Sequence, residues 1–317
     1  MSYIEWMHTG SLPREQVGGK GASLAEMISA GFKVPDGFVV TADAYRHFAS
    51  ATGIADRINE ALGKLQPSDT AGLRHATELI TGLVREMELP EDLKAEITEA
   101  HAELESRLGP HTAVRSSATS EDGVEASFAG LYESYLNMVG INEVLDAIHR
   151  CYVSLWAERA VGYRAGRAEG ANEAMAVVVM SLVPSETAGI AFTAHPVTGS
   201  LDQVIINASF GLGEAIVSGR VTPDSFLIDK NGFTLLERNI YPKELAIYPH
   251  EGGGGGTVED RLSPDRQREP SLTDEQACEV ARLAADVEKH YGSPQDIEWA
   301  LYEGTLYLLQ SRPITTL

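Results

Sequence analysis

Four polar residues near the C-terminus are spaced as if they share one face of a β-hairpin. Asp296 and Glu298 are two residues apart in one stretch of strand type, and Gln310 and Arg312 are two apart in the next. Side chains at this spacing on a strand project from the same face. Burying two acids, an amide and an arginine is costly without a ligand. Carboxylate and amide oxygens suit Mg²⁺, and an arginine suits phosphate.

A simpler alternative for these four residues needs no ligand. Arg312 can form an ion pair with Asp296 or with Glu298 inside the hairpin. The sequence alone leaves both interpretations open.

Two basic residues near the N-terminal end lie in segments that suit phosphate. Lys20 belongs to the run GGKG, which directly precedes a helical pattern, and glycines let backbone amides approach phosphate oxygens. Gly21 stands where a Walker A loop requires Ser or Thr, so this is not that motif. Arg115 ends a predicted strand and is followed by SSAT, whose hydroxyls can cap the backbone or line an anion pocket. The alternatives are a glycine turn with an exposed lysine, and a surface arginine beside a serine turn.

Other motifs carry little chemistry. The run GLGE at 211–214 is explained equally well by a strand, a turn and a second strand. None of the nine histidines pairs at metal-ligand spacing, and no nucleophile motif of a hydrolase occurs. We expect His195 to shape a turn in TAHPVTG rather than to act in catalysis.

Composition excludes several classes of protein. The 317 residues carry a net charge of −21, which weighs against nucleic acid as a partner. No run approaches the roughly 18 apolar residues of a membrane helix, so we expect no membrane partner. Cys151 and Cys278 are far apart, which fits a reducing cytoplasm better than a disulfide framework. The expected location is therefore cytoplasmic.

The elements that must position these residues alternate between helical and strand patterns. A helix is predicted over 22–31, a helical layer over 42–108 with breaks near 66–67 and 89–90, and a helix over 142–168. The buried run 174–183 reads as a strand ended by Pro184, and the second half begins β-rich. The clearest helix has Thr273 as N-cap and ends at Gly292. These patterns predict an α+β fold with lobes near 1–178 and 179–317.

Seven blocks in family order make the sequence resemble a known domain family. It is similar to the nucleotide-binding domain shared by phosphoenolpyruvate synthase, pyruvate phosphate dikinase and rifampicin phosphotransferase. The blocks are VGGKGASLAEM, VRSSATSEDGVEASFAGLYESYLN, SLWAERAVGYR, GIAFTAHPVTG, ASFGLGEAIVSG, PQDIEWA and LLQSRPITTL. KELAIYPHEGG and the ending QSRPITTL look closest to rifampicin phosphotransferase.

This resemblance implies a two-lobed ATP-grasp fold, with ATP held between the lobes, and roles for the polar residues. Lys20 and Arg115 would bind the phosphates and act in catalysis. Glu298 and Gln310 would hold magnesium. Arg312 would stabilise the transferred phosphate. The implied cofactors are therefore ATP and Mg²⁺.

Further positions match the family's contacts to the nucleoside. Gly130 and Ser134 match residues that touch ATP, although the family more often has Thr at 134. The segment Met180 to Val183 matches the linker whose backbone reads adenine, and Glu186 is placed to meet the ribose. Met180 stands where the family usually has Gln, and His195 where it usually has Asp or Asn, which leaves nucleotide selectivity open.

The resemblance also implies a dikinase reaction. The β-phosphate of ATP would pass through a phosphohistidine on a swivelling domain to an acceptor such as rifampicin, leaving AMP and phosphate. The alternatives are the ATP-binding domain of phosphoenolpyruvate synthase, and a nucleotide-binding partner subunit without turnover. No histidine here has the family's Thr-Ser-His context. We therefore expect this chain to be incomplete for turnover, with histidine and acceptor-binding domains in a longer chain or on a separate partner.

Overall fold

The protein forms two compact units. A computed structural model describes residues 2–63, 70–119, 133–165, 173–252 and 254–315. Residues 1–26 and 36–182 make the N-terminal unit, and residues 27–35 and 183–317 make the C-terminal unit. The chain thus passes between the units after Glu26, Pro35 and Leu182, whereas the lobes expected from the sequence meet near residue 178. That the two form one nucleotide-binding module stays a prediction.

The N-terminal unit is built on an antiparallel five-stranded sheet. Its strand order is β1-β2-β5-β3-β4. The strands are β1 (Ile4–Trp6), β2 (Gly37–Val40), β3 (His111–Ala118), β4 (Ser134–Val139) and β5 (Met175–Ser181).

Helices cover one face of this sheet. The helices that contact its strands are α2 (Ala42–Ala51), α5 (Glu91–Leu108) and α6 (Ile141–Ser154). The others, α3 (Ile54–Leu62), α4 (Thr70–Glu86) and α7 (Glu158–Ala165), pack on helices. Phe48 and Tyr152 from these helices pack in one buried cluster with Phe38, Val114 and Val177 from the strands. The predicted helical layer is confirmed, with its second break at Leu89 and Pro90 between α4 and α5.

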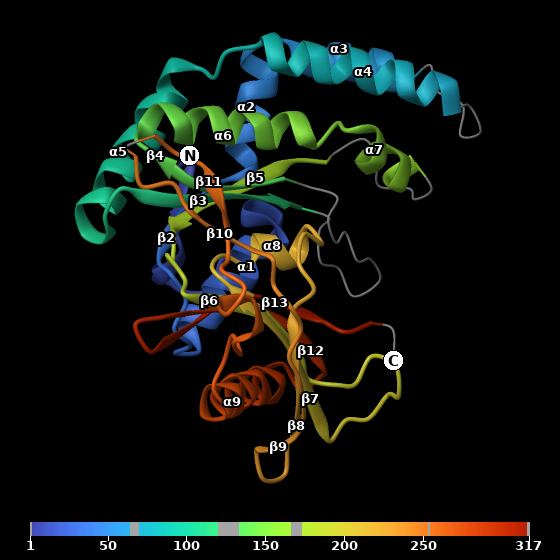
Figure 1. Ribbon diagram of the computed structural model, residues 1–317. Helices are drawn as coiled ribbons and strands as arrows, with labels where there is room; N and C mark the ends of the chain where they lie inside the picture. The colour runs from blue at the N-terminus through green and yellow to red at the C-terminus, as the bar shows by residue number, and fades with distance from the viewer. Residues whose placement is uncertain (1, 64–69, 120–132, 166–172, 253, 316–317) are drawn as a thin grey trace. The chain divides into compact units, whose positions relative to one another are not determined.

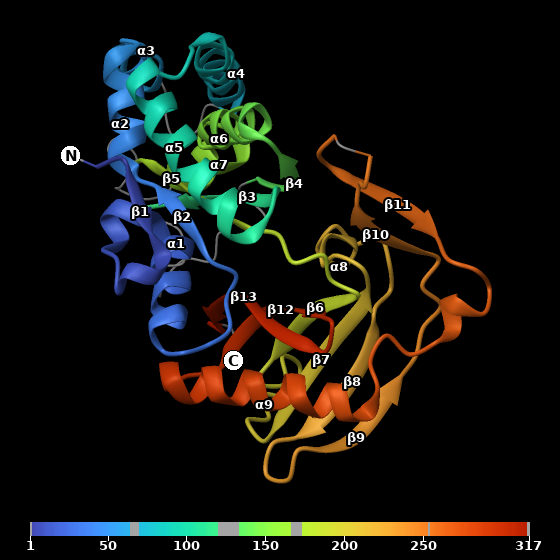
Figure 2. The same ribbon diagram turned by 90° about the vertical axis from the view of Figure 1, so that its left-hand side faces the viewer.

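Helix α1 (Arg14–Ser29) lies on the other side of the sheet from α2 and α6, as Figure 1 and Figure 2 show. It begins eight residues earlier than the predicted helix at 22–31. The prediction was wrong because the glycine pair Gly18 and Gly19 was taken as a turn before the helix. Only Gly18 departs from helical geometry, with φ 70° and ψ 180°, and it divides α1 into two pieces.

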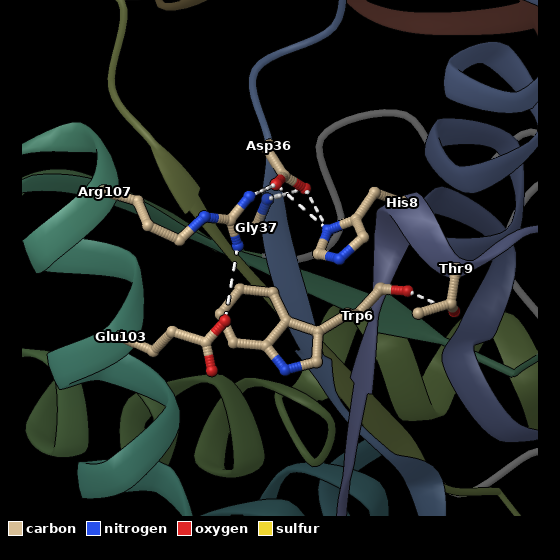
Figure 3. Close-up of polar contacts among 7 residues, drawn as sticks. All are labelled: Trp6, His8, Thr9, Asp36, Gly37, Glu103 and Arg107. Atoms are coloured by element: carbon tan, nitrogen blue, oxygen red, sulfur yellow. Dashed lines mark hydrogen bonds and ion pairs between the residues drawn. The ribbon is translucent and has the colours of Figure 1, made fainter.

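A polar cluster fixes the start of β2. The Asp36 carboxylate accepts hydrogen bonds from Arg107 (Nη2, 2.6 Å) and from the Gly37 amide (2.8 Å), and it lies 3.0 Å from His8 Nδ1 (Figure 3). The Arg107 guanidinium also lies over the Trp6 ring, 5.3 Å from its centre. Gly37 in turn pairs with Met180 of β5. The cluster therefore fixes β2, the strand that pairs with the predicted nucleotide contact Met180.

The C-terminal unit contains an antiparallel six-stranded sheet in the order β13-β12-β6-β7-β8-β9. The unit also contains a separate hairpin of β10 and β11 and a short helix, α8. The bounds are β6 (Thr187–Phe192), β7 (Gln203–Phe210), α8 (Glu214–Val217), β8 (Asp224–Asp229), β9 (Thr234–Asn239), β10 (Leu245–Pro249), β11 (Thr257–Arg261), α9 (Asp274–Tyr291), β12 (Gln295–Tyr302) and β13 (Thr305–Pro313).

Helix α9 covers one face of this sheet, as Figure 2 shows. Its start and end are those predicted. Thr273 accepts a hydrogen bond from the Gln276 amide in a reciprocal capping box, and Gly292 ends the helix in the left-handed conformation. Apolar residues line the covered face of the neighbouring strands, among them the fully buried Ile297 and Trp299.

A buried ion pair ties β8 to the segment that follows β9. Lys243 Nζ lies 2.6 Å from Asp224 Oδ1, and both side chains are fully buried. The other oxygen of Asp224 accepts hydrogen bonds from the amide and hydroxyl of Ser271. Every charge in this group thus has partners.

We expect Lys243→Ala to lower the free energy of unfolding of the C-terminal unit by about 3–5 kcal/mol, because it leaves the Asp224 carboxylate buried without its cation. Urea denaturation measures this change. Arg238→Ala is the matched control, since it breaks an exposed pair with Asp274 and should cost less than about 1 kcal/mol. Equal losses for the two variants would contradict the prediction.

Among the described residues, no helix has the length and apolar character needed to cross a membrane.

Candidate functional site

The C-terminal hairpin brings its four polar residues into register. Asp296 pairs with Arg312, and Glu298 pairs with Gln310, across β12 and β13. Side chains directly opposite in an antiparallel pair lie on the same face with Cβ atoms about 4.5–5.5 Å apart. All four therefore share one face, as the alternation suggested.

A β-bulge decides which residues meet. Trp299 pairs with Leu308 and Glu298 with Gln310, so Leu309 is an extra residue in β13. If β13 kept the register that pairs Leu308 with Trp299, Leu309 would lie opposite Glu298. Gln310 and Arg312 would then project from the other face of the sheet than Asp296 and Glu298. The bulge thus assembles the polar face.

This polar face lies on the side of the sheet away from α9. Ile297 and Trp299, which alternate with Asp296 and Glu298, point to the covered side and are fully buried. Glu298 remains partly exposed, whereas Gln310 is buried. Glu298 and Arg312 are thus the more accessible members of this face.

Arg312 is already engaged with one of the acids. Its Nη2 lies 2.6 Å, and its Nε 2.8 Å, from the same oxygen of Asp296. The Asp296 side chain is only 8% exposed, against 31% for Arg312. Burial raises the pKa of Asp296 above its usual value; Arg312 opposes this rise and Glu298 adds to it. The internal ion pair is thus formed with Asp296, and it orients the arginine.

Glu298 and Gln310 are suited to hold a magnesium ion together with phosphate. Both end in hard oxygen donors, and they are direct cross-strand neighbours. In the described part of the chain, no group of three or more His, Cys, Asp or Glu side chains could hold a metal ion. Mg²⁺ in nucleotide enzymes commonly takes one or two protein ligands and completes its shell with phosphate oxygens and water. The residues present fit that kind of site.

In the N-terminal unit, four predicted contacts lie on or beside the sheet face that α1 covers. Arg115 pairs with Ser134 of β4 and with Val178 of β5. Met180 pairs with Ala113, two residues before Arg115, so it shares that face. Lys20 lies in α1, next to Gly21, whose amide bonds to β3. Gly130 lies outside the described residues.

The hydroxyls that follow Arg115 bond to protein groups. Ser116 donates to the Glu133 carbonyl oxygen at 2.9 Å, and Ser117 donates to that of Val17 at 2.7 Å. Thr119 donates to the Glu173 carboxylate at 3.0 Å. Ser116 and Ser117 thus cap backbone carbonyl groups, whereas the role in an anion pocket stays a prediction. The contact of Ser117 could not be predicted because its partner lies 100 residues away.

The predicted adenine linker runs out of β5. The amides of Ser181 and Leu182 already donate to the carbonyl oxygens of Asp36 and His111. The Val183 amide makes no hydrogen bond within the described part of the chain. Glu186 is exposed, and its amide donates to Leu301 at the end of β12. Val183 therefore has the backbone donor that remains for a ligand.

Two other motifs have structural roles. His195 Nδ1 accepts hydrogen bonds from the amides of Val197 and Thr198, so it shapes a turn as expected. The run 211–214 does not lead into a strand as suggested, because α8 begins at Glu214. Gly211 has φ 76°, and a Cβ there would lie 2.2 Å from the Ile247 carbonyl oxygen of β10. The close approach of β10 explains this glycine.

The chain matches one known protein family over nearly its whole length. Residues 14–317 match the family described as pyruvate phosphate dikinase, AMP/ATP-binding domain. The chain belongs to this family. The AMP/ATP-binding domain here is 42% identical to a probable phosphoenolpyruvate synthase of Methanocaldococcus jannaschii, over 100% of this chain and 27% of the relative.

Two more relatives bear on the acceptor. The phosphoenolpyruvate synthase of Pyrococcus furiosus is 40% identical over 95% of this chain and 42% of its own length. A rifampicin phosphotransferase from Streptomyces is 43% identical over 95% of this chain and 34% of its own length. The chain thus spans well under half of each of these relatives. Six relatives, including the two synthases named above, are phosphoenolpyruvate synthases or probable ones, so the alternative, phosphoenolpyruvate synthase, is better supported than rifampicin phosphotransferase.

Proposed function

We propose that this chain is the ATP-binding domain of a dikinase of the phosphoenolpyruvate synthase type, with a two-lobed ATP-grasp fold. The family match and the synthase relatives support this function. The single observation that carries it is the register of β12 and β13, which sets Glu298 opposite Gln310 and Asp296 opposite Arg312.

Lys20 and Arg115 are proposed to bind the phosphates. A lysine acts as a compact charge, and an arginine offers a planar fork of donors to phosphate oxygens. The chain has 25 basic against 46 acidic residues, so local cations are needed where a polyphosphate binds. Ser134, directly opposite Arg115, and Gly130 would contact the nucleotide from the adjoining segment.

Glu298 and Gln310 are proposed to hold Mg²⁺, which when bound would offset phosphate charge and orient the triphosphate. Arg312 would stabilise the charge that develops on the transferred phosphoryl group, with Asp296 holding the guanidinium in place. Met180 to Val183 would meet adenine through the backbone, with the Val183 amide as a donor, and Glu186 would meet the ribose.

The proposed reaction transfers the β-phosphate to a histidine nitrogen of a separate swivelling domain. The bond between the α- and β-phosphates breaks to leave AMP, and water cleaves the bond between the β- and γ-phosphates to release inorganic phosphate. The residues described here bind and orient the nucleotide, and the attacking nitrogen comes from outside this domain. The phosphohistidine then phosphorylates the acceptor, for which we propose pyruvate.

ATP labelled in the β-phosphate tests this proposal. The chain would be incubated with Mg²⁺, a histidine domain and an acceptor domain, in the presence of pyruvate or rifampicin. We expect AMP and labelled phosphoenolpyruvate. Label in rifampicin alone would instead support the second candidate, which the 43% identical rifampicin phosphotransferase favours. ATP binding without AMP formation under any condition would indicate a nucleotide-binding subunit without turnover.

A further inference from the structure

The break in α1 is bridged by a side chain from the sheet. In an uninterrupted helix, the Val17 carbonyl oxygen would accept a hydrogen bond from the amide of Gly21, four residues later. Here Ser117 Oγ donates to Val17 O at 2.7 Å and accepts from Gly21 N at 3.0 Å. The hydroxyl therefore stands in the place of one helical hydrogen bond.

The surrounding geometry admits little else at this position. Ser117 is fully buried in β3. Gly18 has φ 70°, and a Cβ there would lie 2.0 Å from the Ser117 carbonyl oxygen and 2.3 Å from its Oγ. A side chain at position 18 would thus collide with the backbone of β3 as well as with the hydroxyl. The glycine and the serine together determine how the two pieces of α1 meet.

The bridged turn contains Lys20, and the strand that supplies the serine contains Arg115. Lys20 lies between Gly18 and Gly21, inside the segment whose hydrogen bond Ser117 replaces. Arg115 is two residues before Ser117, so the two side chains project from the same face of β3. Ser117 therefore joins the two elements that carry the cations proposed to bind phosphate.

We propose that Ser117 is a positioning residue that sets Lys20 relative to Arg115 for binding the phosphates of the nucleotide. This inference rests on the proposed function. Without the hydroxyl, either Val17 and Gly21 form the direct helical bond or both groups stay unsatisfied. The first outcome changes the backbone direction at Lys20, and the second removes a contact that holds this segment against β3. The effect of Ser117 on ATP should then pass through Lys20.

A double-mutant cycle tests this dependence. ATP affinity would be measured for the wild-type chain, Ser117→Ala, Lys20→Ala and the double variant. We expect Ser117→Ala to weaken ATP binding roughly tenfold in the wild-type background, because two buried backbone groups lose their partner. In the Lys20→Ala background the same change should weaken binding less than about twofold. A general loss of structure would give the same fold-change in both backgrounds.

Thr112→Val is the matched control. Thr112 is a fully buried residue of the same strand, and its hydroxyl donates to the Met138 carbonyl oxygen at 2.9 Å. Its loss should lower stability without changing ATP affinity. If Ser117→Ala fails to fold, the cycle would use Ser117→Cys, whose thiol keeps the size and a weak donor.

Equal fold-changes in the two backgrounds, or no change in either, would overturn the positioning role. A wild-type chain that binds no ATP would instead overturn the proposed function. Amide exchange at Gly21 gives a second readout, since Ser117→Ala should alter its protection and Thr112→Val should not.

Discussion

Arg312→Ala should slow phosphoryl transfer to a histidine domain by a factor on the order of 10²–10³, while ATP affinity falls much less. The reason is that the guanidinium matters most as charge develops on the transferred group, and removing one such donor typically costs that much in rate. Single-turnover measurement of phosphohistidine formation, together with equilibrium binding of ATP, separates the two effects.

The control for this variant must allow for the ion pair. Arg312→Ala leaves the buried Asp296 carboxylate without its partner, so a loss of rate can reflect a loss of structure. The double variant Arg312→Ala, Asp296→Asn removes that charge and should still show the slow transfer. Arg238→Ala removes an exposed arginine of the same unit and should leave the rate unchanged. Equal losses in rate and in ATP affinity for the double variant would refute the proposed role of Arg312.

Glu298→Gln should lower the transfer rate at physiological Mg²⁺ by a comparable factor and raise the Mg²⁺ concentration needed for half-maximal rate. The substitution keeps the shape and removes the one charged ligand proposed for the metal. It should not harm the fold, because it also removes a carboxylate whose charge raises the pKa of Asp296. The rate measured over a series of Mg²⁺ concentrations shows both changes.

Glu303→Gln is the matched variant for this prediction. Glu303 lies exposed at the turn of the same hairpin, and its substitution also removes one negative charge. We expect an unchanged dependence on Mg²⁺. If the two variants shifted that dependence equally, general charge rather than coordination would explain the effect.

Local signals made some elements predictable. The capping box at Thr273 and the left-handed Gly292 are determined by neighbouring residues, so α9 was predicted at both ends. The alternation of Asp296 with Glu298 likewise predicted a shared face. Whether Arg312 pairs with Asp296 or Glu298 was not decidable, because the bulge at Leu309 sets the register and leaves no clear mark in the sequence.

Long-range contacts account for the errors in α1 and in the run 211–214. Gly18 takes its conformation from Ser117, about 100 residues away, and Gly211 from Ile247 of β10. A glycine-rich run reads as a turn when its partners are unknown. The same limit hid Ser117 as a candidate, because a serine beside a turn is an ordinary capping residue until its partner is seen.

The role of the chain as a magnesium-dependent ATP-binding domain is tested most directly by calorimetric titration of the wild-type chain with ATP. The titration is run once with Mg²⁺ and once after treatment with a chelator. We predict clear binding with Mg²⁺ and affinity at least roughly tenfold weaker without it, because metal, Glu298 and Gln310 together offset the triphosphate charge. Equal affinity in the two titrations would contradict the magnesium site. Absence of binding in both would contradict the proposed function of the chain.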